Sequence, residues 1–263
     1  MKQRIITAIV GIIITVPIIL YGNWPFILFA YILGTIALFE MIRMYKPKFN
    51  LFFTLLSTVF LWFMLVPIDD FEINSFSLTK FELIMMLSII LLVASVLTKN
   101  NFTFDHASFL VLATIYVGIS FYFVIETRLL GLDYFLFILF TIWATDSGAY
   151  FIGKYFGKRK LWPAISPNKT IGGAIGGILF ALMFAFIFYL FDTLDRSLFS
   201  IFLLAFIISI AGQIGDLVAS AIKRHYNIKD FGNLLPGHGG ILDRLDSFLF
   251  VVLVLHIFQV LSS

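Results

Sequence analysis

The most evident absence from the sequence is cysteine, followed by charge. None of the 263 residues is Cys, so disulfides, a thiolate nucleophile and Cys-ligated zinc are excluded. Lys, Arg, Asp and Glu make up only 13% of the chain, about half of their share in soluble domains. The formal net charge of +3 is too small to indicate a nucleic-acid partner. These absences leave the apolar residues as the main source of information.

Hydrophobic residues dominate the chain and fall into long runs. They account for 61% of the residues, with 33 Phe and a mean hydropathy of +1.03. A transmembrane helix needs about 20 mostly apolar residues. The sequence therefore predicts an all-α fold, a polytopic integral membrane helical bundle of about nine transmembrane helices. The predicted spans are 5–21, 24–42, 51–67, 81–98, 107–125, 134–152, 171–191, 198–219 and 243–261.

The distribution of Lys and Arg predicts how these helices are oriented. With the N-terminus in the cytosol, all 18 Lys and Arg fall on the cytosolic side except Lys80, Arg128 and Arg196. Such an excess is typical of cytosolic loops. The first run follows two cations, as in a signal peptide, but no small-residue cleavage site comes after it, which favours a retained helix. We therefore expect a cytosolic N-terminus, with segments 68–80 and 192–197 on the outer face.

The connections between the runs predict one membrane-embedded domain over residues 1–263. Most connections are short, and only 153–170 and 220–242, both predicted to be cytosolic loops, have the length and polarity to build a site. Residues 1–130 would then supply scaffold helices or the wall of a lipid cavity. Residues 131–263 would form the catalytic half.

Four acids lie in or beside the apolar runs at one predicted membrane face. Asp243 and Asp246 share a helix face at i and i+3. Asp216 lies near the end of the eighth run, and Asp146 about 9 Å below the surface at 1.5 Å per residue. A divalent cation would hold such carboxylates ionised, and all-oxygen ligands favour Mg²⁺ or Mn²⁺ over Zn²⁺. The alternatives are that Asp243 stabilises a helix N-terminus while Asp246 pairs with Arg244 or Lys223, or that the acids relay protons.

The segment before the ninth run combines glycines with cations. Residues 236–240 read Pro-Gly-His-Gly-Gly and lead directly into the predicted helix. Glycine lets the backbone approach an anion, and a helix N-terminus favours negative charge. We expect phosphate binding here, with His238 as a phosphate donor or a proton-transfer group. A histidine satisfied by backbone, and glycines that only start a helix, are the structural alternatives. The cations that would help to bind the phosphate are Lys223, Arg224, Lys229 and Arg244.

The other predicted cytosolic loop ends in small polar residues and glycines. Residues 166–170 read Ser-Pro-Asn-Lys-Thr, which are donors suited to phosphate or ribose. The glycines that follow, at 172, 173, 176 and 177, form two overlapping G-x-x-x-G patterns. Those patterns favour close helix packing in a bilayer over ligand contact. The Lys-Arg-Lys cluster at 158–160 is more typical of contact with anionic headgroups than of substrate binding.

Residues 220–246 resemble the signature of the phosphatidate cytidylyltransferases, also called CDP-diacylglycerol synthases. Residues 146–150 (Asp-Ser-Gly-Ala-Tyr) and 166–170 are similar to two further segments of that family, although Gly172 stands where members often have Glu or Gln. The motifs cover about residues 143–246, and the first 140 residues are similar only in hydrophobic character and span count. The thirteen matching positions are Ser220, Lys223, Arg224, Lys229, Asp230, Gly232, Pro236, His238, Gly239, Gly240, Asp243, Arg244 and Asp246.

The resemblance implies a reaction and its cofactors. CTP and phosphatidate would give CDP-diacylglycerol and pyrophosphate, in phospholipid biosynthesis. Mg²⁺ would be required, with Mn²⁺ as a substitute and K⁺ as a second cation, and the enzyme would be a homodimer. A chain of 263 residues without an added soluble domain fits a bacterial plasma membrane. The active site would face the cytosol.

Roles for individual residues follow from the acids, the cations and the resemblance. The predicted catalytic residues are Asp216, Asp243, Asp246, Lys223, Arg224 and His238. The predicted metal ligands are Asp216, Asp243 and Asp246, with Asp146 as a further candidate. The predicted substrate-binding residues are Ser166, Asn168, Lys169, Thr170, Ser220, Lys229, Gly239, Gly240 and Arg244.

Two other functions use similar residues. A CTP-dependent polyprenol kinase would share metals and glycines but release CDP in place of pyrophosphate. An ion-coupled transporter would use the acids as proton relays and show flux without CTP. The complete 220–246 pattern favours the cytidylyltransferase over both.

Overall fold

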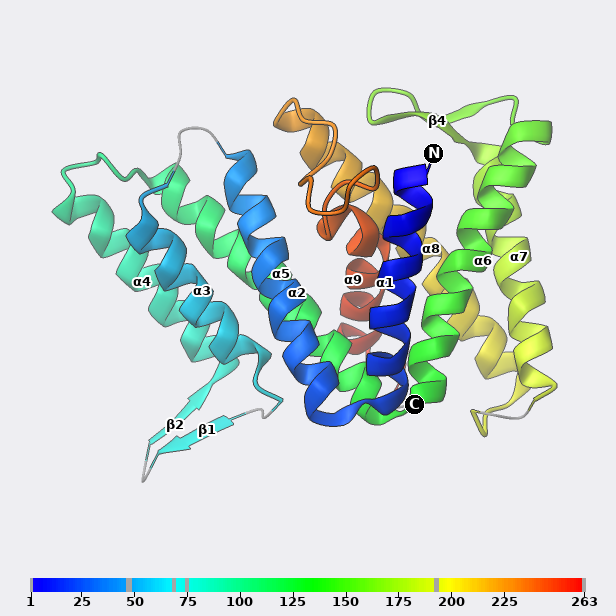
Figure 1. The fold of residues 1–263 in the computed structure, drawn as a ribbon, viewed down its shortest axis with the longest axis horizontal. Helices are drawn as coiled ribbons and strands as arrows, with labels where there is room; N and C mark the ends of the chain where they lie inside the picture. The colour runs from blue at the N-terminus through cyan, green and yellow to red at the C-terminus, as the bar shows by residue number, and fades with distance from the viewer. Residues whose placement is uncertain (1, 46–48, 68–69, 74–75, 192–193, 262–263) are drawn as a thin grey trace. The chain divides into compact units, whose positions relative to one another are not determined.

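The computed structural model describes residues 2–45, 49–67, 70–73, 76–191 and 194–261, and within these ranges the chain forms nine helices (Figure 1). Every predicted apolar run is a helix, which confirms the all-α class. Lys46 and Lys48, on which the predicted orientation partly depends, lie outside the described residues. The helices are α1 (Lys2–Tyr21), α2 (Asn23–Met44), α3 (Leu51–Leu65), α4 (Lys80–Leu97), α5 (Phe104–Leu130), α6 (Leu132–Phe156), α7 (Ile171–Tyr189), α8 (Leu198–His225) and α9 (Leu242–Ile257).

The chain divides into two compact units, and the division is not a simple cut. The first unit contains residues 1–126 together with 231–242, and the second contains 127–230 together with 243–263. The first break lies close to the predicted border between the scaffold and catalytic halves. Residues 231–242, however, pack with the N-terminal helices although they were assigned to the catalytic half. The prediction of a single domain stays a prediction.

The first unit is an up-and-down set of helices that pack against one another through large apolar side chains. Helices α1 to α4 alternate in direction along the chain (Figure 1). Leu38 of α2 and Leu61 and Met64 of α3 have no exposed surface. Gly118 of α5 makes room for Met64, because an added Cβ would lie 2.8 Å from its sulfur. A short antiparallel hairpin, β1 (Asp70–Ile73) and β2 (Phe76–Thr79), precedes α4.

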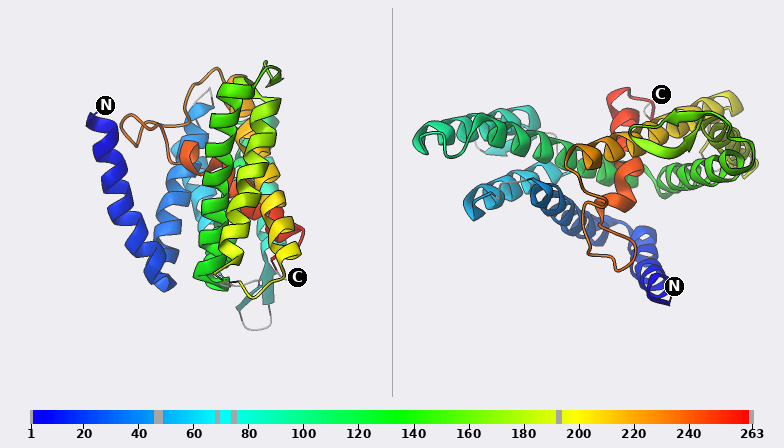
Figure 2. Two further views of the ribbon diagram at one scale, coloured as in Figure 1. Left: turned by 90° about the vertical axis from the view of Figure 1, so that its right-hand side faces the viewer. Right: turned by 90° about the horizontal axis from the view of Figure 1, so that it is seen from above.

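The second unit is built around an unusually close pair of helices, α6 and α7, which run side by side in both views of Figure 2. A Cβ on Gly173 would lie 2.8 Å from the carbonyl oxygen of Ala149, and one on Gly177 would lie 2.9 Å from that of Thr145. Gly148 faces the partner helix in the same way, because an added Cβ would lie 2.6 Å from the carbonyl oxygen of Gly176. The G-x-x-x-G patterns therefore serve helix packing, as predicted.

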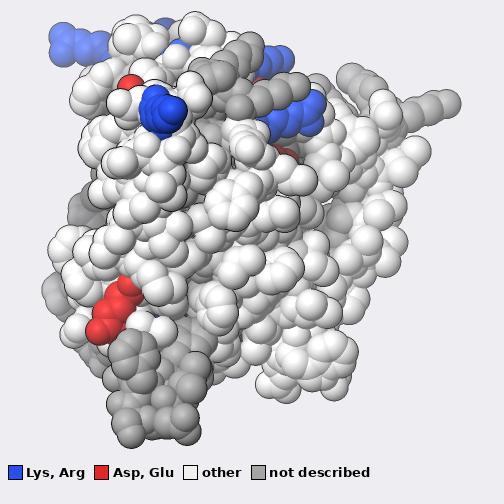
Figure 3. All heavy atoms as spheres, turned by 90° about the vertical axis from the view of Figure 1, so that its left-hand side faces the viewer, with Lys and Arg blue, Asp and Glu red and all other residues white. Residues whose placement is uncertain are grey.

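Helix length and composition make this a multi-pass membrane protein. In the described part of the chain, six helices are long and apolar enough to cross a bilayer: α2, α4, α5, α6, α7 and α8. Shorter apolar helices lie at 6–21 and 51–65, so a count of nine spans stays a prediction. On the face shown in Figure 3, Lys and Arg gather at one end, and a broad band below them is almost free of charge. Such a surface suits hydrocarbon.

Both predicted cytosolic loops contain more regular structure than expected. Helix α8 continues to His225, so Ser220, Lys223 and Arg224 are helical and not part of a loop. Charge ended the predicted span at 219, but Ala, Lys and Arg are good helix formers, and the helix stops only before Asn227, which has a φ of 53°. In the loop predicted at 153–170, α6 extends to Phe156, and an antiparallel hairpin follows, β3 (Lys160–Trp162) and β4 (Ser166–Thr170).

Candidate active site

The second unit contains a cavity of about 640 Å³ that is lined by charged side chains. Its walls come from α6, the β3–β4 hairpin, α7 and α8. Gly153, Gly157 and Gly173 contribute backbone to the wall, which widens the space between the charged groups. The polar lining residues are Asp146, Tyr150, Lys154, Lys160, Asn168, Lys169, Thr170, Gln213 and Asp216. The cavity thus combines three cations with two of the four predicted acids.

An ion pair in this cavity joins the hairpin to α8. The ammonium nitrogen of Lys169 lies 2.5 Å from Asp216 Oδ2 and donates to the carbonyl oxygen of Gln213 over 3.3 Å. Both side chains remain open to solvent, with exposed fractions of 25% for Lys169 and 39% for Asp216. Because neither side chain is sealed in, the pair can open when another ion enters.

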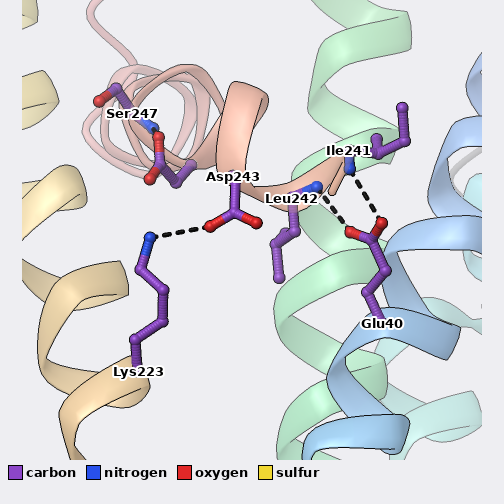
Figure 4. Close-up of polar contacts among 7 residues, drawn as sticks. Glu40, Lys223, Ile241, Leu242, Asp243 and Ser247 are labelled. Carbon is purple, nitrogen blue, oxygen red and sulfur yellow. Dashed lines mark hydrogen bonds and ion pairs between the residues drawn. The ribbon is translucent and has the colours of Figure 1, made fainter. Parts of the chain in front are cut away.

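A second ion pair joins α8 to the first turn of α9. Lys223 donates to Asp243 Oδ1 over 2.9 Å, as Figure 4 shows. This pair is buried, with exposed fractions of 13% for Lys223 and 3% for Asp243. Asp246 is also buried, and its Oδ1 accepts the backbone N–H of Ser247 over 2.8 Å. The sequence had offered Lys223 as a partner for Asp246, and the structure gives it to Asp243.

Asp216 connects the two groups of acids electrostatically. It repels Asp146 on one side and Asp246 on the other, while Asp243 also repels Asp246. Lys169 attracts Asp146, and Lys223 attracts Asp246. Asp216 is therefore the acid of α8 that links Asp146 of α6 to Asp246 of α9, with one lysine on each side.

The predicted acids match a divalent cation in chemistry but are not arranged around one. Among the described residues, no three Asp, Glu or His side chains converge closely enough to hold a metal as they stand. Lysines lie against Asp216 and Asp243 instead. The chemistry of clustered carboxylate oxygens nevertheless suits Mg²⁺ or Mn²⁺. The oxygen donors therefore suit the ion by their chemistry but are not gathered around one point in the described residues, and a metal site here stays a prediction.

The glycine-rich turn at 236–240 belongs to the first unit, and its donors are largely used inside the protein. The N–H groups of His238 and Gly239 both donate to the carbonyl oxygen of Leu235, over 2.8 and 3.1 Å. Gly237 and Gly239 have φ values of 79° and 89°, which favour glycine. The turn was expected to offer its N–H groups to phosphate, but these two close the turn itself.

One residue of this region was missed by the sequence analysis. Glu40 on α2 accepts the backbone N–H groups of Ile241 and Leu242, each over 2.9 Å (Figure 4). It is only 7% exposed. The signal was present in the sequence, since an acid within a predicted transmembrane run is a functional candidate by itself.

The other predicted residues take different positions. Thr170 caps α7, because its hydroxyl accepts the N–H of Gly173 over 3.0 Å. Arg224 donates to the carbonyl oxygen of Ile165 over 3.4 Å and so connects α8 to the hairpin. Ser220 lies on α8 and Ser166 on β4, and neither lines the cavity. Lys229 and Arg244 are exposed.

Known proteins resemble this chain over its whole length. The profile of the cytidylyltransferase family matches residues 2–262. A phosphatidate cytidylyltransferase of Bacillus subtilis (strain 168) is 46% identical over 266 residues, covering 100% of this chain and 99% of the relative. One from Staphylococcus aureus (strain COL) is 42% identical over 262 residues, covering 100% of both chains. One from Staphylococcus saprophyticus is 41% identical over 258 residues, covering 98% of each. The chain is thus a member of the cytidylyltransferase family of nucleotidyl-transferring enzymes, as its 220–246 pattern predicted.

Proposed function

We propose that this protein transfers the cytidylyl group of CTP to phosphatidate, giving CDP-diacylglycerol and pyrophosphate. The observation that carries the proposal is the full-length identity to three relatives named phosphatidate cytidylyltransferase. The charged cavity of the second unit agrees with it, because a triphosphate needs several cations and a membrane lipid needs a site next to apolar helices. The polyprenol kinase and the transporter have no observation in their favour.

In the proposed reaction, an oxygen of the phosphatidate phosphate attacks the α-phosphorus of CTP, and pyrophosphate leaves. The attacking phosphate is already anionic, so the main demands are to position two polyanions and to neutralise charge. Lys154, Lys160 and Lys169 line the cavity and would neutralise phosphate oxygens. Lys169 can exchange the carboxylate of Asp216 for a phosphate, since both are anionic oxygen acceptors and the pair is partly open to solvent.

The acids have a different part in the proposal. Asp216, Asp243 and Asp246, with Asp146 as a further ligand, would hold Mg²⁺ or Mn²⁺, and K⁺ is a candidate second cation. A bound divalent cation would supply charge neutralisation for the triphosphate. The burial of Asp243 and Asp246 restricts their motion and keeps bulk water from them. Lys223 holds the carboxylate of Asp243 in place through the 2.9 Å contact.

The proposal also includes the surroundings of the enzyme. The bias of Lys and Arg supports a cytosolic active site, where CTP is available. Bacterial relatives and the six long apolar helices support a bacterial plasma membrane. A homodimer is part of the proposal on the family resemblance alone.

The test is pyrophosphate release by detergent-purified protein with CTP, phosphatidate and Mg²⁺, each omitted in turn. We expect strict dependence on all three, with the lipid converted to a CDP-linked product. Release of CDP without pyrophosphate would replace the proposal with the kinase. Complete inertness of folded protein would overturn the enzymatic proposal and favour the transporter.

A further inference from the structure

The N-terminus of α9 has an unusual cap, because its acceptor comes from another helix. The residue before the helix is Ile241, whose side chain has no oxygen to accept the first N–H groups. Isoleucine is among the poorest residues for this position. Glu40, 201 residues earlier in the chain, provides both carboxylate oxygens instead, Oε1 for Ile241 and Oε2 for Leu242.

The surrounding backbone is shaped to receive this carboxylate. A Cβ added to Gly240 would lie 2.5 Å from the carboxyl carbon and from both oxygens of Glu40. A Cβ on Gly232 would also collide with this carboxyl group. Neither glycine has a φ in the left-handed region, so the backbone conformation does not require glycine there. These two glycines are explained by the space that Glu40 occupies.

The position of Glu40 gives it an effect on the residues that follow. The first turn of a helix frays unless its N–H groups have acceptors, and a carboxylate at that end is favoured by the helix dipole. Asp243 directly follows Leu242, and Asp246 lies one turn further along α9. The backbone that Glu40 holds is therefore the backbone from which both acids extend.

We infer that Glu40 is a positioning residue for the acids of α9, holding the first turn in the register that aims Asp243 and Asp246. This inference rests on the proposed function. It also explains Gly240 of the family pattern differently, because the missing side chain leaves space for the carboxylate of Glu40 and not for a substrate phosphate. A displacement of about 1 Å at a reacting group can cost about 100-fold in rate.

The test compares Glu40→Gln with wild type in kcat, in KM for CTP, in the half-saturating Mg²⁺ concentration, and in hydrogen exchange of residues 241–246. The amide of Gln accepts one N–H but directs its own N–H at the other. We expect kcat to fall about 10- to 100-fold, KM for CTP to change by less than about 3-fold, a higher Mg²⁺ requirement, and faster exchange at 241–246.

Glu82→Gln is the matched control, because Glu82 is also a carboxylate at a helix N-terminus. It forms a capping box with Thr79 at the start of α4, in which Glu82 Oε2 accepts the backbone N–H of Thr79, with 2.7 Å between the nitrogen and the oxygen. We expect this variant to lose some thermal stability and to keep the wild-type kcat. A residue that only stabilises its helix would behave like Glu82.

A second pair of variants tests the same contact without an assay of activity. Gly240→Ala is expected to lower thermal stability in the wild type and to have little further effect in a Glu40→Ala background, because the obstructing carboxylate is then gone. Additive effects would overturn the contact. If the wild type is active, two results would overturn the positioning role. One is an unchanged kcat in Glu40→Gln, and the other is a loss of activity that only parallels a loss of stability, as expected of a helix cap like Glu82. An inactive wild type would reject the proposed function separately.

Discussion

The two lysine–aspartate pairs of the second unit have the same chemistry and opposite surroundings. Lys169–Asp216 lies in the wall of the cavity and remains partly open to solvent. Lys223–Asp243 is almost completely buried between α8 and α9. Exposed ion pairs contribute little to stability because water competes for both ions. A buried pair costs much to break, because the ion left behind has lost both water and its partner.

This difference separates two tasks that residue types alone do not distinguish. The open pair can change partners during a reaction cycle, so Lys169 suits the binding and release of phosphate. The buried pair keeps one geometry, so Lys223 suits the fixed placement of Asp243. In the proposed reaction, Lys169 would act on the substrate and Lys223 on the protein.

The most damaging change to the buried pair is Asp243→Asn. It leaves the buried Lys223 without this carboxylate, so we expect the free energy of unfolding to fall by about 3 to 5 kcal/mol and activity to be lost. Thermal unfolding in detergent and the pyrophosphate assay measure the two effects. The double variant Lys223→Met/Asp243→Leu should regain stability but not activity. Recovery of activity in the double variant would contradict a role of Asp243 in the reaction.

Asp246→Asn removes a buried charge that forms no ion pair with a lysine among the described residues. Burial and the repulsion from Asp216 disfavour this charge more than Lys223 and the N–H of Ser247 favour it, so stability should be unchanged or slightly higher. Activity should fall on the order of 1,000-fold, with the protein folded. Normal pyrophosphate release by this variant would rule out Asp246 as a metal ligand.

Lys169→Met tests the open pair. We expect the free energy of unfolding to change by at most about 1 kcal/mol, because the pair is partly solvated. The KM for CTP should rise about 10-fold, as expected for the loss of one cation that neutralises phosphate. Steady-state kinetics over a range of CTP concentrations would show it. A large loss of stability with unchanged KM would reverse the two tasks.

The smallest effect is expected for Lys158→Ala. Lys158 is exposed in the same loop, yet it does not line the cavity. We expect less than about a 2-fold change in kcat/KM and no change in thermal stability. A Lys169-like increase in KM would mean that the cations of this loop act together, without distinction between cavity and surface.

The sequence could predict the helices because long apolar runs determine them. It could also predict that acids gather at one end of the helices, because Asp146, Asp216, Asp243 and Asp246 recur near run ends. The lysine partners were less accessible. Lys169 reaches Asp216 only because a hairpin returns it to α8, and no local pattern indicates that path. Lys223 was assigned to a loop because charge was taken to end the helix, whereas helix propensity continued it.

Glu40 shows a different limit of sequence reasoning. Its acceptor role depends on backbone N–H groups, which every residue except proline has, so nothing in the side chains of 241 and 242 indicates it. Gly240 was assigned to phosphate binding or to the start of a helix, and Gly232 only matched the family pattern. The three-dimensional contact shows that the carboxyl group of Glu40 fills the space beside both. A lone acid in an apolar run was the available signal.

The long sequence separation between Glu40 and its donors has a consequence for the synthesis of the protein. The 201 residues between Glu40 and Ile241 take about 10 to 40 s to synthesise at 5–20 residues per second. During that interval α2 has been made and its carboxylate lacks these two donors. The contact of Glu40 in the first unit therefore forms only after Ile241 and Leu242 have been made. A chain truncated before residue 241 would lack this contact.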